Sequence, residues 1–541
     1  MSTKKIKSGI IYGDQNFTVP PNLNFGEFVL KKILAHERDK TGMINGETGE
    51  SITYGEMAQK IVNIASSLLR LGVKVGDVVA ISSENRIEYM LSSLAIFSCG
   101  AIVTYFNNSY TKDDFIHALH VSKPSYIFIS GEVFKNHYET IKSTKMIKKY
   151  ILYDDVSRSS DFIQFDDLVN KHTDIRSYKA HDFKDSLQTC LILYSSGTTG
   201  LAKGAKLNHL NLIIGCQNIA TTRNLILLTV APWSSTMGLI CTLREIVYGR
   251  KVVFLAKYIE RVYLATIQKY KIGMLLVAPP LIVMLYKSKI ANEFDISTVE
   301  ILYSGGAPID PKSIAQIKMR FPNIKYVLQG YGMTEATGAV TEDLDTAPKE
   351  GSVGIPAAGI ILKVADPETD KVLGSNEPGE VRIKGTVVFE GYIGKDLKDD
   401  LDEEGFYKTG DIAYYDDEGY FYIVDRIKEL IKYKAWQVAP SELEALILQH
   451  PAVKDVGVTG APDALAGELP TAFVVKQPNA NITEQEIINF VSDKVSPWKR
   501  LRGGVIFLKE IPKTASGKIL RRELKQLVQN RNPQKIPASK L

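Results

Sequence analysis

A run of small and hydroxylated residues after an apolar segment is the part of the sequence best suited to chemistry. The run extends from Tyr194 to Gly204 (YSSGTTGLAKG) and follows the apolar residues Cys190 to Leu193. Small residues let backbone N–H groups approach an anion closely, hydroxyls add donors, and Lys203 adds a positive charge. The segment therefore predicts a loop that binds a polyphosphate. It differs from a Walker A loop, because the sequence has no Gly-Lys-Ser or Gly-Lys-Thr.

Three shorter segments combine glycine with hydroxyl, aromatic or acidic side chains. In Gln329–Glu335 (QGYGMTE), glycines flank an aromatic residue, so a flat ring can lie against the backbone, and Thr334 and Glu335 add groups suited to phosphate and Mg²⁺. Ser304–Pro308 (SGGAP) predicts a tight turn with exposed backbone edges, and the acid in Tyr407–Asp411 (YKTGD) is able to accept both hydroxyls of a ribose. Taken singly, each segment is more often an ordinary turn than a binding site.

Helical and strand patterns alternate around these segments. Apolar residues at helical spacing from Met57 to Leu71 predict a helix, and the apolar run Val78–Ile81 predicts a buried strand. We expect a further helix over Glu88–Ser98 and a strand over Ala101–Phe106. Short, continuously apolar strands separated by helices are typical of parallel βαβ units with helices on both faces. The fold class expected is therefore α/β, with a large N-terminal part built of βαβ-type subdomains.

The pattern changes after about residue 374. Alternating strands over Gly379–Lys384 and Gly419–Val424 predict a small β subdomain, and from Pro440 the pattern becomes that of a compact α+β unit. We place the boundary in the charged stretch Asp425–Lys428. Residues 1–426 then form the N-terminal part, and residues 427–541 form a small, mobile C-terminal lobe.

Several helix starts can be predicted in the C-terminal lobe. Two Ser/Thr-x-x-Glu pairs, Ser441 with Glu444 and Thr483 with Glu486, predict capping boxes that open amphipathic helices. A final helix is expected to begin near Ile519.

Composition excludes several classes of protein. The 541 residues include 66 Lys and Arg against 61 Asp and Glu, for a net charge of +5, and 45% are hydrophobic and 23% charged. A disordered chain would be less apolar, and a disulfide scaffold would be shorter and richer in cysteine. The charge is too weak to favour nucleic acid or an anionic membrane as partner. Four cysteines lie far apart in the sequence, and we expect buried, reduced thiols: Cys99, Cys190, Cys216 and Cys241.

Three segments of the sequence bear on targeting and membrane anchoring. The first residues, Met1–Lys7, have no apolar stretch behind them, so we expect no secretory signal. The most apolar window, Ile272–Tyr286, is too short to span a bilayer and contains two prolines, which favours a core strand followed by a turn. The last residues, Ser539–Leu541 (SKL), match the peroxisomal address tripeptide. We therefore expect a peroxisomal location and the peroxisomal import receptor as a partner.

In this order, the four glycine-containing segments resemble the motifs of the adenylate-forming superfamily, which includes acyl- and aryl-CoA ligases, adenylation domains and beetle-type luciferases. The resemblance extends from about Asn45 to Leu541. It is closest to the branch of luciferases and 4-coumarate-CoA-ligase-like proteins, notably across Asp425–Lys434 and Gln437–Pro440. It implies an enzyme with two steps. A carboxylate first attacks the α-phosphorus of ATP to give an acyl-adenylate and pyrophosphate, and a second nucleophile or an oxidant then consumes this mixed anhydride.

The resemblance implies a role for each matching residue. The residues implied to bind ATP are Ser195, Ser196, Gly197, Thr198, Thr199, Gly200 and Lys203 at the β- and γ-phosphates, Gly305, Gly306 and Tyr331 at adenine, and Asp411 and Arg426 at ribose. Thr334 is implied to contact phosphate, Glu335 to help bind Mg²⁺, and Lys518 to bridge the carboxylate and the α-phosphate. A fixed ammonium and a metal ion offset the negative charge that gathers in such a reaction.

Enzymes of this superfamily rotate the C-terminal lobe between the two steps. The resemblance puts the hinge near Lys428 and implies that Lys432 then replaces Lys518 in the site.

The resemblance also implies a pocket for the acid. Its expected lining residues are Ser235, Met237, Cys241, Gly338 and Ala339. These side chains are small or soft, so an aromatic or fatty acid fits better than a charged amino acid. Ordinary core packing explains each of them about equally well.

Several positions depart from the family pattern. Ser234 and Ser235 stand where luciferases and many ligases have His, and a hydroxyl cannot supply an imidazolium. Ala435 stands where Gly usually leaves room for the pantetheine arm of CoA, which puts the CoA step in doubt. Ala202 replaces the usual Pro, and Arg223 is a weak candidate for an arginine that beetle luciferases contribute from this region.

These observations leave three hypotheses. The preferred one is an ATP- and Mg²⁺-dependent ligase that activates a fatty or aryl acid and passes it to CoA. The alternative is a luciferase-type monooxygenase, in which O₂ attacks the adenylate and light is emitted. The third is a non-catalytic relative, against which the retention of Lys518, Glu335 and Asp411 counts.

Overall fold

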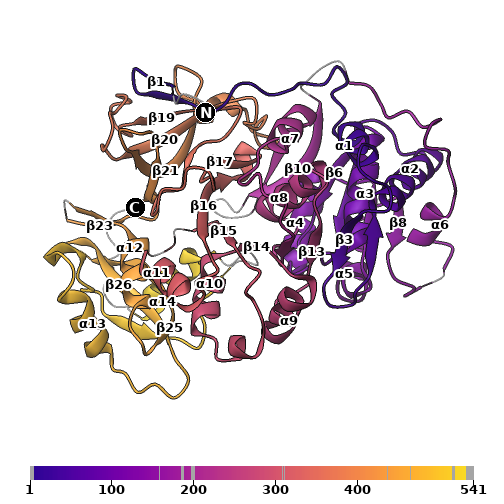
Figure 1. Ribbon diagram of the computed structural model, residues 1–541. Helices are drawn as coiled ribbons and strands as arrows, with labels where there is room; N and C mark the ends of the chain where they lie inside the picture. Colours follow the sequence, from indigo (N-terminus) through magenta and orange to yellow (C-terminus); the bar gives the residue numbers. More distant parts are fainter. Residues whose placement is uncertain are drawn as a thin grey trace.

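The computed structural model describes residues 5–157, 159–183, 188–195, 202–307, 309, 311–434, 436–463, 465–513 and 518–531. In it, α/β layers form the large N-terminal part, a β-sheet subdomain lies beside them, and the C-terminal lobe, yellow in Figure 1, lies below that subdomain. The predicted fold class is confirmed. The boundary at residues 426 and 427 stays a prediction.

The first sheet is built from the expected βαβ units. Its strand order is β11-β10-β6-β5-β7-β8-β9, with all neighbours parallel except β10 and β11. Its strands are β5 (Val78–Ser82), β6 (Ile102–Tyr105), β7 (Tyr126–Ile129), β8 (Lys149–Leu152), β9 (Phe162–Gln164), β10 (Thr189–Ser195) and β11 (Lys203–Asn208). The outer face is covered by helices α4 (Lys112–Ser122) and α5 (Gly131–Ser143).

The second sheet has a parallel centre and antiparallel edges. Its strand order is β18-β17-β16-β15-β14-β12-β13-β3-β4, and the neighbours from β16 to β3 run parallel. Its strands are β3 (Thr41–Asn45), β4 (Ser51–Thr53), β12 (Leu227–Thr229), β13 (Val252–Phe254), β14 (Met274–Val277), β15 (Ile301–Gly305), β16 (Tyr326–Met333), β17 (Gly338–Glu342) and β18 (Ile355–Pro356). One face packs on α9 (Glu260–Tyr270), α10 (Pro279–Lys287) and α11 (Pro311–Arg320).

A shared layer of helices fills the space between these sheets and forms the main core (Figure 1). Its helices are α1 (Phe25–Leu34), α2 (Tyr54–Arg70), α3 (Ile87–Ser98), α7 (His209–Gly215) and α8 (Thr236–Val247), and the short α6 (Phe165–Val169) flanks α2. Thr53 and Glu56 form a capping box at the start of α2. Gly26 lets α1 approach α3 closely, because a Cβ at this position would lie 2.4 Å from the backbone N of Ser98.

The third sheet is antiparallel and carries part of the candidate site. Its strands are β1 (Lys5–Lys7), β2 (Ile10–Tyr12), β19 (Ile360–Ala365), β20 (Gly379–Gly385), β21 (Tyr407–Tyr415) and β22 (Phe421–Arg426), in the order β1-β2-β19-β20-β21-β22. In its register Asp411 on β21 pairs with Arg426 on β22. This pairing places the carboxylate of Asp411 and the guanidinium of Arg426 side by side at one edge of the sheet.

The C-terminal lobe is a small α+β unit with its own core. Its strands are β23 (Ile431–Tyr433), β24 (Trp436–Val438), β25 (Val453–Asp463), β26 (Gly467–Lys476) and β27 (Val505–Phe507). Its helices are α12 (Pro440–Leu448), α13 (Glu484–Ser492) and α14 (Arg521–Arg531). On the surface of the lobe Trp436, which is half exposed, stacks on Trp498 with ring centroids 4.3 Å apart.

One of the two capping boxes predicted in the lobe forms. Thr483 and Glu486 cap α13 as expected. The pair Ser441 and Glu444 does not, because Pro440 is already the first residue of α12 and the N-cap, Ala439, has no side chain to accept a hydrogen bond.

The apolar window Ile272–Tyr286 also differs from its prediction in part. It begins with the expected core strand, β14, but the prolines open helix α10 and do not form a turn. Proline is well suited to the first turn of a helix, where no intrahelical hydrogen bond is lost.

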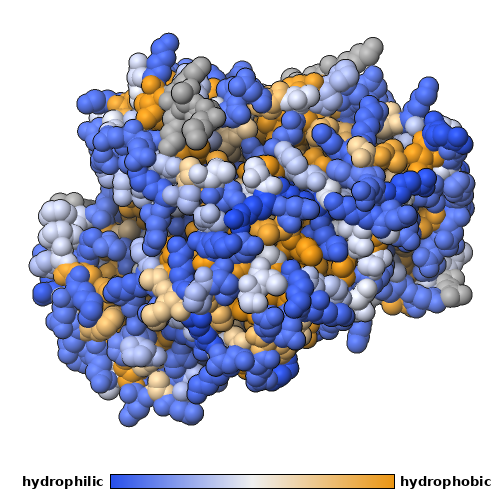
Figure 2. Space-filling model, viewed as in Figure 1, coloured by the Kyte–Doolittle hydropathy of each residue, from blue (hydrophilic) through white to orange (hydrophobic). Residues whose placement is uncertain are grey.

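The surface and the cysteines fit a folded protein with ordinary polarity. None of the described helices combines the length and the apolar character needed to cross a bilayer. On the face seen in Figure 2, most side chains are hydrophilic and apolar residues appear in scattered patches. All four cysteines lie in the described part of the chain as free thiols, of which Cys99, Cys190 and Cys216 are buried.

Candidate active site

The predicted site residues gather where parallel strands end. Ser195 ends β10, Gly305 ends β15, and Thr334 directly follows β16. Ser195 belongs to the first sheet and the other two residues to the second, and each lies at the carboxyl end of its strand, where ligands of parallel α/β sheets bind.

Of the predicted phosphate-binding loop, the structure describes the two ends. Ser195 on β10 pairs with Lys203 on β11, and Nε2 of His117 lies 2.8 Å from the carbonyl oxygen of Ala202. The middle of the loop, Ser196, Gly197, Thr198, Thr199 and Gly200, lies outside the described residues. The ends thus fix where the loop leaves and rejoins the sheet.

Tyr392 connects the end of this loop with the predicted Mg²⁺ ligand. The ammonium of Lys203 lies 5.1 Å from the centre of the Tyr392 ring, and the Tyr392 hydroxyl donates to Oε1 of Glu335 at 2.5 Å. Burial, and next the carboxylate of Glu335, raise the pKa of Tyr392, so this phenol stays a donor. Lys203 and Glu335 therefore both contact Tyr392.

The surroundings of Glu335 fit a metal that is shared with a phosphate. Among the described residues no group of three or more His, Cys, Asp or Glu could hold a metal ion. Mg²⁺ is usually bound by one or two carboxylates together with substrate phosphates, and not by a cage of protein ligands. A single buried carboxylate beside Lys203 matches that mode.

Tyr331, Asp411 and Arg426 form a connected corner beside the second and third sheets. The Tyr331 hydroxyl donates to Oδ2 of Asp411 at 2.6 Å, and Nε of Arg426 lies 2.9 Å from Oδ1 of Asp411. Burial, and next the charge of Asp411, raise the pKa of Tyr331. Each carboxylate oxygen keeps a second lone pair, so Asp411 can still accept from ribose hydroxyls.

The two glycines predicted at adenine lie at the end of β15. Gly306 has a φ of +86°, in the region that favours glycine, and a Cβ on Gly305 would lie 3.3 Å from the carbonyl oxygen of Gly330. The absence of side chains leaves the backbone edge open beside Tyr331, as a flat ring requires.

Lys518 reaches this corner from the C-terminal lobe. Burial, and next the guanidinium of Arg426, lower the pKa of Lys518, while Glu429 and Asp411 oppose this shift. The charges that act on this ammonium are thus those of the predicted ribose corner. Lys432 lies elsewhere, exposed on β23, and its backbone N–H donates to Glu468 at 2.9 Å.

Polar contacts next to the corner hold α14 within the lobe and tie the lobe to β22. Arg521 on α14 lies 3.4 Å from Glu429 and 2.7 Å from Glu444 on α12. The Ser441 hydroxyl donates to Asp425 on β22 at 2.9 Å. Ser441 and Glu444, predicted to form a capping box, therefore make these longer-range contacts.

Helix α8 joins the phosphate side of the site to the predicted acid pocket. The hydroxyls of Thr236 and Thr334 lie 3.1 Å apart. Ser235 is the N-cap of α8: its hydroxyl accepts from the Gly238 N–H at 3.3 Å and donates to the Pro232 carbonyl at 2.7 Å. The serine at this position therefore caps the helix.

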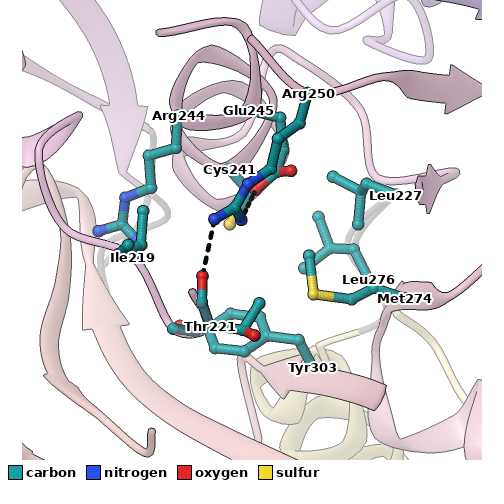
Figure 3. Close-up of a pocket in the computed structure, with 11 residues that line it drawn as sticks. Ile219, Thr221, Leu227, Cys241, Arg244, Glu245, Arg250, Met274, Leu276 and Tyr303 are labelled. Atoms are coloured by element: carbon teal, nitrogen blue, oxygen red, sulfur yellow. Dashed lines mark hydrogen bonds and ion pairs between the residues drawn. The ribbon is translucent and has the colours of Figure 1, made fainter. Parts of the chain in front are cut away.

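The remaining predicted acid-pocket residues line neighbouring elements. Sδ of Met237 lies 3.3 Å from the position that a Cβ of Gly305 would take. Gly338 and Ala339 begin β17, which pairs with β16 next to Tyr331. Cys241 lines a narrow pocket between α8, β14 and β15, which Figure 3 shows.

The sequence predicted a uniformly apolar acid pocket. The lining of this pocket is instead partly polar and charged. Its apolar lining is formed by Ile219, Ala220, Leu227, Met274 and Leu276. Thr221, Arg244, Glu245, Arg250 and Tyr303 add polar and charged groups at one end (Figure 3). These groups could not be predicted from the sequence, because on an isolated helix Arg244 and Glu245 resemble an ordinary polar face.

Arg223 does not lie at the predicted site, so its candidacy is wrong. It pairs with Glu300 and lies 3.7 Å from Asp345. Glu300 precedes β15, whereas Gly305 ends that strand. Arg223 therefore occupies the opposite edge of the sheet.

Tyr392, which contacts both Lys203 and Glu335, was not predicted as a site residue, because no local motif surrounds it.

Comparisons with known proteins agree with this arrangement. A family model described as "AMP-binding enzyme" matches residues 30–393, and one described as "AMP-binding enzyme C-terminal domain" matches residues 442–518. The chain is 36% identical over 534 residues to luciferin 4-monooxygenase of Photuris pensylvanica, covering 96% of this chain and 98% of the relative. It is 36% identical over 529 residues to probable 4-coumarate–CoA ligase 1 of Dictyostelium discoideum, covering 93% and 95%.

A solved structure extends the likeness to the fold. ATP-bound MatB from Rhodopseudomonas palustris superimposes with a TM-score of 0.82 at 25% identity, over 94% of this chain and 99% of that one. The resemblance stated from the motifs is thereby confirmed, while the individual site roles stay predictions. The chain belongs to the AMP-binding enzyme family and is an ATP-dependent adenylate-forming enzyme of the luciferase and acyl-CoA ligase kind.

Proposed function

We propose that the protein activates a hydrophobic carboxylic acid, fatty or aryl, as its acyl-adenylate and then transfers the acyl group to CoA. The observation that carries the proposal is the Tyr331–Asp411–Arg426 corner, two of whose charges act on the buried ammonium of Lys518. The similarity to a probable 4-coumarate–CoA ligase supports CoA as the acceptor.

The residues of the site divide the work of the first step. Asp411 and Arg426 hold the ribose, and Lys203 contacts the outer phosphates. Thr334 and Lys518 flank the α-phosphate, where the carboxylate oxygen attacks and pyrophosphate leaves. Fixed positive charge at this point stabilises the transition state more than the ground state. Mg²⁺ held by Glu335 and phosphate oxygens would supply further charge neutralisation.

The first prediction concerns Lys518. Lys518→Ala should lower the rate of ATP–pyrophosphate exchange by on the order of 10²–10³, because a charge aimed at the reacting phosphate is lost. The measurement is exchange of labelled pyrophosphate into ATP over a panel of fatty and aryl acids. Lys513→Ala is the matched control, since Lys513 lies in the same segment but pairs with Asp455 at 2.6 Å. Absence of exchange with every acid in the wild-type protein would refute adenylation.

A second candidate for the consuming step is oxidation by O₂ with light emission. The 36% identity to a luciferin 4-monooxygenase favours it. Alanine at position 435, which lies outside the described residues, also favours it, because the family usually has Gly there to leave room for pantetheine. Incubation with ATP, Mg²⁺ and candidate acids, with and without CoA, separates the two outcomes. A thioester in darkness supports the ligase, and light without thioester supports the monooxygenase.

We also propose a peroxisomal location through the import receptor. The support is the tripeptide Ser539-Lys540-Leu541, which lies outside the described residues. Fluorescent fusions that end in the natural tripeptide or lack it test this, and a diffuse signal from both would contradict it.

A further inference from the structure

The hydroxyl of Thr236 lies at the nucleotide side of the site and contacts a predicted catalytic group. Thr236 is the first residue of α8, and its Oγ1 lies 3.1 Å from Oγ1 of Thr334. Either hydroxyl of this pair can donate. Both residues are half-buried, so neither hydroxyl is closed off in the core. The contact links α8 directly to the residue expected at the α-phosphate.

The neighbouring Ser235 cannot take this place. Its hydroxyl donates its one proton to the Pro232 carbonyl at 2.7 Å and accepts from the Gly238 N–H at 3.3 Å. The turn is also tight, since a Cβ on Gly238 would lie 2.4 Å from the carbonyl oxygen of Pro232. The hydroxyl that α8 brings to Thr334 is therefore that of Thr236.

Packing fixes the two threonines relative to each other. Thr334 opens the short 3₁₀ helix Thr334–Ala336, after which the chain enters β17 at Gly338. A Cβ on Gly338 would lie 3.6 Å from Cγ2 of Ile240, which is four residues after Thr236 on α8. The branched Cβ of threonine also restricts its χ1 angle. The hydroxyl of Thr236 is thus held in place by its own helix and by the strand beside it.

The number of protons decides the direction of this hydrogen bond once a nucleotide is bound. A threonine hydroxyl has one proton and two lone pairs, whereas the oxygens of an ionised phosphate only accept. When Thr334 donates its proton to the α-phosphate, it can only accept from Thr236. The hydrogen bonds then run from Thr236 through Thr334 to the phosphate.

We propose that Thr236 is a positioning residue for adenylation, which donates its proton to Thr334 and thereby aims the Thr334 hydroxyl at the α-phosphate. The inference rests on the role proposed for Thr334. A hydroxyl that accepts a hydrogen bond is polarised and becomes a stronger donor. Because the phosphate gathers negative charge as the carboxylate attacks, this donor stabilises the transition state more than bound ATP.

The first experiment removes the Thr236 hydroxyl and restores it. Thr236→Val keeps the branched shape, and Thr236→Ser keeps the hydroxyl. Loss of one hydrogen bond between neutral groups corresponds to about 3- to 10-fold, so kcat of ATP–pyrophosphate exchange should fall by this factor in Thr236→Val, while KM for ATP stays within about twofold. Thr236→Ser should recover most of the rate. Thr236→Ala gives the same comparison if valine disturbs the start of α8.

Thr242→Val is the matched control on the same helix. Thr242 is fully buried, and its hydroxyl accepts from Nε1 of Trp233 at 3.0 Å. Its loss should lower the midpoint of chemical denaturation and leave kcat unchanged. A kcat that falls in parallel with stability in both variants would assign Thr236 a role in folding only and overturn the inference.

A double-mutant cycle separates action through Thr334 from an independent effect. In the Thr334→Val background, Thr236→Val should cause no further loss of kcat, because the group that Thr236 positions is already absent. The same loss in both backgrounds, or an unchanged kcat in Thr236→Val, would overturn the inference and leave adenylation intact. Full activity of Thr334→Val would refute the role proposed for Thr334, and absence of exchange with every acid in the wild type would refute adenylation itself.

Discussion

At the scale of single residues, the buried carboxyl of Glu245 has an unusual titration. Burial raises its pKa from 4.5 to about 7, although Arg250 and Arg244 oppose the shift. The other groups that face it keep their charge near neutrality. The guanidinium groups remain cationic, burial raises the pKa of Cys241 to about 12, and burial also raises the pKa of Tyr303.

This titration predicts a pH-dependent stability. Below about pH 7 the folded protein holds Glu245 mainly as the acid, and above it mainly as the carboxylate. The unfolded chain loses this proton near the ordinary pKa of 4.5, so the contribution of Glu245 to the free energy of unfolding should fall as the pH rises from about 4.5 to 7. Chemical denaturation of the wild type and of Glu245→Gln at pH 5 and pH 8 measures this contribution, because all other groups titrate in both proteins. The fall should be smaller in Glu245→Gln, and an equal fall in both proteins would contradict the assignment.

At the scale of elements, the contact between α1 and α3 depends on one glycine. Gly26→Ala should destabilise the protein by about 1–3 kcal/mol, because a Cβ would collide with the backbone and the hydroxyl of Ser98, both 2.4 Å away. Gly131→Ala at the start of α5 is the matched control. There the nearest atoms belong to the side chains of Val156 and Asp154, which can move. Chemical denaturation of both variants checks the difference, and equal midpoints would show that α1 shifts without cost.

Local patterns predicted most elements of the fold. The spacing from Met57 to Leu71 and the run Val78–Ile81 correspond to α2 and β5, and Thr483 with Glu486 caps α13. Each of these elements depends on residues that are neighbours in sequence.

The predictions failed where residues that are distant in sequence determine the contacts of a side chain. Glu444 does not cap α12; its carboxylate accepts a hydrogen bond from the Val458 N–H at 2.7 Å and pairs with Arg521. The hydroxyl of Ser441 donates a hydrogen bond to Asp425. The same limit applies to the site. Motifs indicated Asp411 and Glu335, but the phenol that contacts Glu335 comes from Tyr392, 57 positions later. The polar end of the acid pocket forms where α8 lies beside β14 and β15. No local pattern in the sequence predicts this packing.

At the scale of the whole molecule, the position of the C-terminal lobe decides whether Lys518 faces the nucleotide corner. Arg521 ties α14 to Glu429, three positions after Arg426 in the sequence, and to Glu444 on α12. Lys312 on α11 adds a contact to Gln449 of the lobe at 2.5 Å. The reach of Lys518 thus depends on contacts away from the site.

Loss of Arg521 should therefore slow adenylation without removing a group that touches ATP. Arg521→Ala should lower ATP–pyrophosphate exchange by on the order of 10- to 100-fold, because small displacements of a reacting group are costly. Lys525→Ala, on the same helix but paired with Glu468 at 3.6 Å, should leave exchange unchanged. Circular dichroism shows whether both variants are folded. An unaltered rate in folded Arg521→Ala would mean that other contacts position Lys518.

The stacked indoles of the lobe have a consequence for optical spectroscopy. The sequence contains 3 tryptophans. Trp233 is fully buried in the N-terminal part, with its ring centroid 5.0 Å from that of Phe254, whereas Trp436 and Trp498 stack on the surface of the lobe. We expect the stacked indoles to couple excitonically and half-exposed Trp436 to be open to aqueous quenchers, whereas Trp233 should emit at shorter wavelength from its apolar environment. The native fluorescence and near-ultraviolet circular dichroism thus carry separate signals for the two parts of the molecule, without any label.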